Sequence, residues 1–255
     1  GWPFGARFIA PNEQIRRIRL QRRVIDGPAV LTWDRGELEK VMNEGSEGQG
    51  GRRRRREDGE AATSRRLAFL RLAPAEHKDF AAGVELVESV AADGSGRIDV
   101  PEGQHVLYAG WDEIGFSHVK LGAPGADGPV VDHLNAAAVR RYLDHMSNTL
   151  GPTLGGRLGN QLRAMFVDSL ELDGANWTGD LASEFEKRRG YVLAPYLPFV
   201  LDRDAPADRS VFADTIRRVR YDYLKTIVEL FHERFLRVYA AWCRDNGVLS
   251  RIQAY

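Results

Sequence analysis

The sequence predicts an α/β protein: a partial (β/α)₈ barrel of the TIM type, with a small antiparallel β domain inserted near its start. Two observations support this fold class. From Gly128 onward, apolar strands alternate with amphipathic helices, which is the order of parallel βαβ units. Between about residues 20 and 125, short apolar runs are instead separated by Asp, Gly and Pro, as is typical of antiparallel sheets.

The composition changes twice along the chain and divides it into three regions. Residues 1–19 open with Gly, Pro and aromatic residues and predict the start of the barrel, with a helix over residues 12–19. Residues 20–125 predict the inserted β domain, and residues 126–255 predict the βα units of the barrel. The two barrel regions together hold about 150 residues, whereas a complete barrel of this kind takes about 250. We therefore expect the barrel to be incomplete.

The inserted β domain is expected to contain an Arg-rich loop. Residues 45–60 include five consecutive arginines, Arg52 to Arg56, among Gly, Gln, Ser and acidic residues, with nothing apolar. Such a segment predicts a disordered loop; a basic patch that serves nucleic-acid binding or localisation has a similar composition. The strands of this domain are predicted at residues 29–33, 67–72, 83–87 and 105–109.

Helix and strand signals are clear in the C-terminal region. A helix is expected over residues 135–150, capped by Asn135, and another over residues 178–189, capped by Thr178 and ended by Gly190. The other expected elements are a long helical stretch over residues 214–246, broken at most once, and strands over residues 129–132, 163–168 and 247–253. Polar residues follow these strands, as they do at the catalytic face of a (β/α)₈ barrel.

The overall composition excludes several classes of function. Lys plus Arg and Asp plus Glu each number 36, so no global field attracts nucleic acid or an anionic membrane. No run approaches the ~20 apolar residues of a membrane-spanning helix, so we expect no membrane span. Cys243 is the only cysteine, which excludes an intramolecular disulfide and a cysteine-based zinc site.

The loop after the strand at residues 163–168 is the strongest candidate site. It brings together three carboxylates, an amide and an indole: Asp168, Glu171, Asp173, Asn176 and Trp177. Glycoside cleavage uses one carboxylic acid to protonate the leaving oxygen and one carboxylate to activate water or attack carbon, while Trp faces and amides hold the sugar. An ordinary hydrogen-bonded turn that caps the next helix has a similar composition, so composition alone leaves both interpretations open.

Asp132 and His133 lie at a similar strand end. They are candidates for a sugar-hydroxyl contact or a cation ligand, and helix capping by Asp132 is the structural alternative. The other five histidines lack the spacing of metal ligands. The sequence shows no phosphate-binding glycine loop and no convincing nucleophile triad.

Several segments together resemble the α-L-rhamnosidases of glycoside hydrolase family 106. Asp-Ser-Leu-Glu at residues 168–171, followed by Asn-Trp-Thr at residues 176–178, resembles the family's Asp-Ser-aromatic-Glu and Trp-Thr pair. The other resembling blocks, in the family's order, are Gly-Trp-Pro-Phe-Gly at residues 1–5, Val-Asp-His-Leu at 131–134, Phe-Glu-Lys-Arg-Arg-Gly-Tyr at 185–191, Tyr-Leu-Pro at 196–198 and Arg-Ile-Gln-Ala at 251–254.

This resemblance implies a (β/α)₈ catalytic domain with a β-rich insertion, hydrolysis with inversion at the anomeric carbon, and a calcium ion that helps to bind rhamnose. Glu171 matches the family's general acid. The residues expected to contact the substrate are Trp2, Asp132, His133, Asp168, Asn176 and Trp177. Leu170 departs from the expected aromatic or bulky residue, which changes the packing under the sugar more than the proton chemistry. Val192 stands where an Asp is expected, which weakens any role carried over to that position.

The resemblance supplies only one of the two carboxylates. The general base should come from a later barrel strand, beyond Tyr255. The chain starts without Met and stops inside an apparent strand, so we expect a fragment that is inactive alone. A retaining hydrolase of another barrel family and a non-catalytic carbohydrate-binding barrel are the alternatives.

The resemblance also sets expectations about ligands and location. The implied partner is a rhamnose-containing glycan from plants or microbes, and the implied location is the bacterial periplasm or the extracellular space. Asp132 and Asp173 are the candidate calcium ligands. The linkage, the aglycone and the oligomeric state are left open by the sequence.

Overall fold

The computed structural model describes most of the chain. Its described residues are 5–43, 64–76, 80, 83–119, 126–168, 170, 172, 174–202 and 210–253. Within them lie a four-stranded antiparallel sheet, a two-stranded parallel pair and the helices that pack on both. The Arg-rich loop predicted at residues 45–60 lies outside the described residues, so its disorder stays a prediction.

The antiparallel sheet occupies the first half of the chain, in the order β1-β4-β2-β3. Its strands are β1 (Arg16–Trp33), β4 (Gly96–Ile114), β2 (Ser64–Pro74) and β3 (Val84–Glu85). The predicted antiparallel strands are confirmed, but β1, β2 and β4 are much longer than predicted. Apolar runs mark only the buried stretches of these strands. Elsewhere charged residues pair across the ladder, as Arg17 does with Glu113 directly opposite it.

The centre of the sheet is buried on both faces. In β4, Val106 and Tyr108 lie in a core cluster shared with the C-terminal helices. Leu107 and Ala109 lie in a second cluster, which is completed by α1 (Leu38–Asn43). Because successive side chains of a strand point to opposite faces, this one run supplies both cores.

The prediction of a helix over residues 12–19 was wrong. A 3₁₀ turn, Pro11–Glu13, is followed by β1 from Arg16 onward. The buried Ile15 and Ile18 suit helical spacing, but Arg16 between them pairs with the buried Asp112 of β4. Pairing with a distant strand overrides the local spacing.

Helix α2 (Ala136–Leu150) and the long C-terminal helix were predicted correctly. Asn135 caps α2, since its side-chain oxygen accepts two backbone N–H groups at 3.1 and 3.2 Å. α5 (Val211–Phe231), a π-helical turn (His232–Leu236) and α6 (Arg237–Asp245) follow one another without a gap. The remaining short elements are α4 (Leu197–Leu201) and 3₁₀ turns at Val87–Ser89, Gly151–Leu154, Leu158–Asn160 and Ala194–Tyr196.

Helix α3 (Leu181–Arg189) ends as predicted, at Gly190, which has the left-handed φ of 81° that glycine adopts most readily. Its predicted cap was wrong. Asp180 occupies the N-cap position, and the hydroxyl of Thr178 instead donates a hydrogen bond to the carboxylate of Asp132. The hydroxyl is therefore used for a contact 46 residues away along the chain.

Strands β5 (Ala164–Val167) and β6 (Leu249–Ile252) pair in parallel, and helices α3 to α6 connect them. This confirms the predicted βαβ connection. The N–H of Gln253 donates to the carbonyl of Val167 at 3.0 Å, so the carboxyl ends of the two strands lie side by side. Among the described residues the parallel sheet has two strands, and the complete barrel is not observed.

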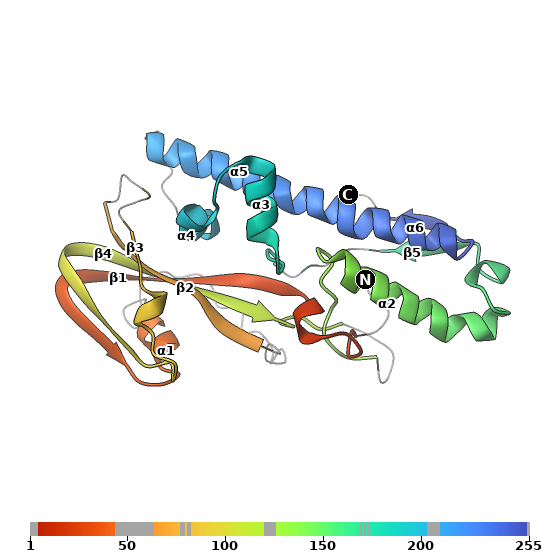
Figure 1. Cartoon of the computed structure of the whole chain (residues 1–255), viewed down its shortest axis with the longest axis horizontal. Coiled ribbons are helices and arrows are strands. Elements are labelled where there is room, and N and C mark those ends of the chain that lie inside the picture. Colours follow the sequence, from red (N-terminus) through yellow and green to blue (C-terminus); the bar gives the residue numbers. More distant parts are fainter. Residues whose placement is uncertain are drawn as a thin grey trace.

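Figure 1 shows how the long helix connects the two sheets. Its α5 end lies over the antiparallel sheet, with α4 and α3 between, and its α6 end lies over β5 and next to α2. The two ends contact different cores. Ile216 and Val219 of α5 belong to the cluster against the sheet, and Tyr239 and Trp242 of α6 belong to the cluster with α2, β5 and β6.

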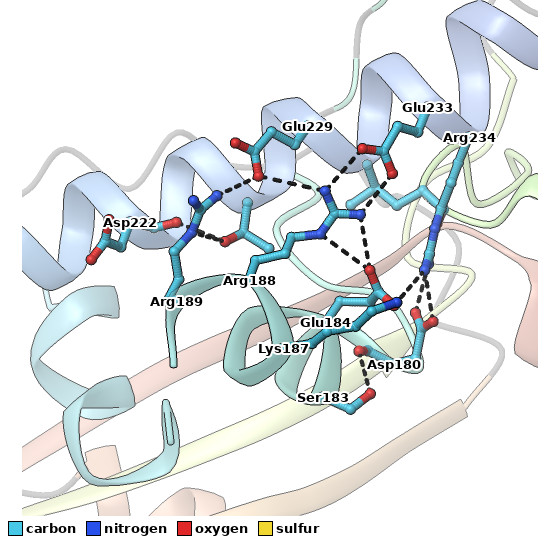
Figure 2. Close-up of polar contacts among 12 residues, drawn as sticks. Asp180, Ser183, Glu184, Lys187, Arg188, Arg189, Asp222, Glu229, Glu233 and Arg234 are labelled. Atoms are coloured by element: carbon cyan, nitrogen blue, oxygen red, sulfur yellow. Dashed lines mark hydrogen bonds and ion pairs between the residues drawn. The ribbon is translucent and has the colours of Figure 1, made fainter. Parts of the chain in front are cut away.

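Charged side chains join α3 to the long helix (Figure 2). The guanidinium of Arg188 donates to Glu184 at 2.9 Å and to both oxygens of Glu233 at 2.6 and 2.9 Å. Arg189 donates to Glu229 at 2.5 Å. Arg234 lies in the π-helical turn of the long helix, and its guanidinium donates to both carboxylate oxygens of Asp180, the N-cap residue of α3, at 2.7 and 2.8 Å. The network holds α3 against the helix that spans both sheets.

We expect Arg188→Met to lower the free energy of unfolding by about 1–2 kcal/mol at low ionic strength, because it leaves Glu184 and Glu233 without their main partner. The loss should shrink in about 1 M NaCl, since salt screens the exposed part of the network. Denaturant titration measures it. Lys187→Met is the matched control, because its side chain is 77% exposed and 3.7 Å from Glu184, and it should change stability by less than about 0.5 kcal/mol. Equal losses for both variants would contradict the proposed network.

Candidate functional site

The candidate loop begins where β5 ends. Asp168 is the first residue after the strand and is exposed. Leu170 and Leu172 are partly buried, and Leu170 packs against the core cluster of α2, α6 and β6. Leucine thus fills the space under the loop where the family resemblance suggests an aromatic residue. A turn follows, in which the N–H of residue 175 donates to the carbonyl of Leu172 and Gly174 has a φ of 83°.

Some of the predicted site residues lie outside the described part of the chain. They are Trp2, Glu171 and Asp173. The predicted roles of Trp2 as a substrate contact and of Glu171 as the general acid therefore stay predictions. The described residues show what surrounds this loop and what holds it.

Asn176 attaches the end of the loop to β1. Its side-chain oxygen accepts the N–H of Ile18 at 2.7 Å, and its amide nitrogen donates to the carbonyl of Ile18 at 3.1 Å. The carbonyl of Asn176 accepts a hydrogen bond from the hydroxyl of Tyr223 on α5. Both polar atoms of the amide are thus used by backbone, so the structure favours a role in fixing the loop over direct sugar binding.

Trp177 continues this attachment. Its backbone forms an antiparallel bridge with Arg16 of β1, and its half-buried indole packs against the core cluster under the sheet. The indole is held by the same core as α3 and α5. Part of the ring stays accessible, and the predicted contact of Trp177 with the sugar stays a prediction.

Asp132 is buried, with 1% of its surface exposed. One carboxylate oxygen accepts the hydroxyl of Thr178 at 2.6 Å and the other accepts the N–H of Leu134 at 2.9 Å. Burial raises the pKa of Asp132 to about 6, even though both hydrogen bonds and the charge of Arg16 favour the ionised form. The carboxylate therefore connects the start of α2 to the end of the candidate loop.

His133 is also buried, at 2% exposure. Its ring meets the ring of Phe231, the last residue of α5, edge to face with 5.9 Å between centroids. Its Nδ1 has no hydrogen-bond partner among the described residues. Burial lowers the pKa of His133 to about 4, so the ring is neutral at physiological pH. Both members of the predicted Asp-His pair lie inside the protein here, and their predicted contact with substrate stays a prediction.

Sequence reasoning missed Arg16, which lies at the centre of these contacts. Its guanidinium pairs with both oxygens of Asp112, at 2.5 and 2.6 Å, and both residues are buried. Asp112 lies opposite Ile18 in the ladder, so the pair is a diagonal contact across two strands. Because residues 12–19 were predicted as a helix, the sequence offered no signal that Arg16 and Asp112 are neighbours.

In the part of the chain that the structure describes, no group of three or more His, Cys, Asp or Glu side chains has the geometry of a metal site. Asp132, a candidate calcium ligand, is buried and accepts one hydrogen bond on each oxygen, and its role as a ligand stays a prediction. No helix in the described ranges is long and apolar enough to cross a membrane.

Comparisons with known proteins agree with the resemblance in the sequence. A solved rhamnosidase from Novosphingobium sp. PP1Y is similar to 69% of this chain, with a TM-score of 0.52 and 26% identity. A protein from Formosa agariphila named "Putative beta-glucuronidase" is 27% identical over 162 residues, or 61% of this chain. The chain spans only 17% and 13% of the length of these two proteins. The family model described as alpha-L-rhamnosidase, glycoside hydrolase 106, matches residues 68–254, well over half of the chain, which therefore belongs to that glycoside hydrolase family.

Proposed function

We propose that this chain is part of the catalytic domain of an inverting α-L-rhamnosidase, in which Glu171 is the general acid. The observation that carries the proposal is the family match, which includes the loop after β5. This loop follows a strand that pairs in parallel with the last strand of the described chain. In (β/α)₈ enzymes the loops at the carboxyl ends of the strands hold the catalytic groups.

The proposed reaction needs two proton transfers, one to the leaving glycosidic oxygen and one from the attacking water. The carboxyl group of Glu171 donates its proton to the glycosidic oxygen as the bond to the anomeric carbon breaks. A general base removes a proton from water, and the water oxygen bonds to that carbon from the opposite face of the ring. In inverting enzymes the two carboxyl groups are about 6.5–9.5 Å apart. We propose that the base belongs to a later strand of a longer catalytic domain, so that this chain alone is inactive.

Calcium enters the proposal only through the family resemblance, as an ion that helps to bind rhamnose. Asp132 is buried and accepts one hydrogen bond on each oxygen, and Asp173 lies outside the described residues, so no ligand set is proposed. We therefore derive no step through the ion. A location in the periplasm or outside the cell and a rhamnosyl glycan as substrate are likewise part of the proposal.

A second specificity has support from one of the comparisons. The relative from Formosa agariphila is named as a glucuronidase, so a uronic acid in place of rhamnose is the alternative sugar. Arg16 is a buried cation whose backbone pairs with that of Trp177, but its guanidinium is paired with Asp112. This arrangement favours a neutral sugar such as rhamnose.

The test compares two aryl glycosides, an α-L-rhamnoside and a β-D-glucuronide, with the longer enzyme and with this chain. We expect the longer enzyme to cleave the rhamnoside and to release rhamnose first as the β anomer, observed by proton NMR before mutarotation. This chain alone should show no turnover. Release of the α anomer would indicate a retaining mechanism. Cleavage of the glucuronide but not of the rhamnoside would show that the substrate carries a glucuronosyl residue. Sugar binding without hydrolysis by the longer enzyme would indicate a carbohydrate-binding barrel.

A further inference from the structure

The three-residue segment Asn176, Trp177 and Thr178 is attached at every position, twice to β1 and once to Asp132. Asn176 bonds through its side chain to both backbone polar groups of Ile18. Trp177 bridges Arg16 through its backbone. The hydroxyl of Thr178 donates to the buried carboxylate of Asp132. The side-chain hydrogen bonds of Asn176 and Thr178 and the backbone bridge of Trp177 attach this segment to residues that are distant in the sequence.

The contact between Thr178 and Asp132 is closed to solvent. Each of the two residues is 1% exposed, and their oxygens are 2.6 Å apart. The other oxygen of Asp132 accepts the N–H of Leu134, so the carboxylate is fixed relative to the start of α2. A buried hydrogen bond to an ionised group is stronger than one between neutral groups, and neither partner can be replaced by water at this burial.

These contacts hold one end of the candidate loop, and strand pairing holds the other. At the first end, β5 is fixed by its ladder with β6. At the second end, segment 176–178 is fixed to β1 and to Asp132. Glu171 lies between the two attachments, five residues before Asn176. A loop that is held at both ends loses less conformational freedom when it positions a catalytic group.

We propose that Asn176, Thr178 and Asp132 are positioning residues, which hold the loop of Glu171 for proton transfer and do not bind the sugar themselves. The kinetic part of this proposal rests on the proposed function. The structural part does not, because the contacts are made within this chain. The two parts therefore need separate experiments.

The structural part is tested on this chain by hydrogen–deuterium exchange. Thr178→Val keeps the shape of the side chain and removes the hydroxyl, and we expect the amides of residues 166–177 to exchange about tenfold faster. Thr178→Ser, which restores a hydroxyl, should return exchange to the original rate. Thr215→Val is the matched control, since Thr215 is only partly buried and its hydroxyl donates within α5 to the carbonyl of Val211, and it should leave the loop unchanged. Unchanged loop exchange in Thr178→Val would overturn the proposal.

The kinetic part is tested on the longer enzyme. We expect Thr178→Val to lower kcat about tenfold with KM within about twofold, and Thr178→Ser to restore kcat. In a Glu171→Gln background, Thr178→Val should cause no further loss, because the loop no longer positions an acid. Asn176→Ser, which removes both bonds to Ile18, provides a second variant with the same expectation in case the first folds poorly.

Two results would overturn the positioning role. One is a rise in KM at unchanged kcat, which indicates direct substrate contact. The other is an equal loss from Thr178→Val with and without Glu171, which shows that the two residues act independently. If Glu171→Gln alone leaves the rate normal, the assignment of the acid fails, and the exchange experiment still decides whether the loop is held as proposed.

Discussion

Replacing Glu171 by Gln in the longer enzyme should lower kcat on an aryl α-L-rhamnoside by about 10²–10⁴-fold, the usual contribution of general acid catalysis. This corresponds to about 3–5 kcal/mol of transition-state stabilisation. The carboxamide has nearly the shape of the carboxyl group but cannot give up a proton. The loss should therefore appear in kcat, while circular dichroism and the melting temperature stay close to those of the original protein.

The leaving group gives the sharpest measurement of this prediction. A phenol of low pKa departs without protonation, so an activated dinitrophenyl rhamnoside should lose much less rate than a plain phenyl rhamnoside. Glu186→Gln is the matched control, since this carboxylate lies exposed on α3, and it should leave both rates unchanged. An equal loss on both substrates would show that Glu171 acts in another way, and an unchanged rate would show that it is not the acid.

Local signals were sufficient to predict much of the second half of the fold. Asn135 and Gly190 act within one helical turn, and their chemistry can be read directly from neighbouring residues. Likewise, strands were predicted at residues 163–168 and 247–253, and the helices between them predicted the parallel pairing of β5 and β6. In each of these cases the interactions that determine the structure join residues close in the sequence, or follow from the helical connection between two strands.

The contacts that organise the candidate site could not be predicted in this way, because they connect distant residues. Arg16 meets Asp112 across 96 residues, and Asn176 meets Ile18 across 158. No local pattern carries such information. Thr178 illustrates the error that results: a Thr just before a helix is a good capping residue by composition, yet a buried carboxylate 46 residues earlier takes its hydroxyl.

Asp132 and His133 should change the free energy of unfolding in opposite directions between about pH 4 and 6. Burial raises the pKa of Asp132 from 3.8 to about 6, with hydrogen bonds from Thr178 and Leu134 and the charge of Arg16 acting against the rise and Asp180 adding to it. Between about pH 4 and 6 the folded state therefore holds a proton that the unfolded state has lost. The contribution of Asp132 to stability must fall as the pH rises through this range, by about 3 kcal/mol in total.

His133 should act in the opposite direction. Burial lowers its pKa from 6.5 to about 4, so between these values the unfolded state holds the proton and the folded state does not. The contribution of His133 to stability is therefore present above about pH 6.5 and is lost as the pH falls through about 4. Its size is again about 3 kcal/mol, because the shift is similar and the sign is reversed.

Because the two effects have opposite signs in the same window, they nearly cancel in the unchanged protein, and only single variants reveal them. Relative to the unchanged chain, Asp132→Asn should gain stability as the pH rises from about 4 to 6, and His133→Gln should gain stability as the pH falls over a similar range. Denaturant titration of this chain at several pH values measures both. Asp99→Asn, at a side chain that is 71% exposed, should stay parallel to the original within about 0.5 kcal/mol. Two variants whose stability differences are independent of pH would show that neither group is buried as the structure has it, since burial is the main cause of both shifts.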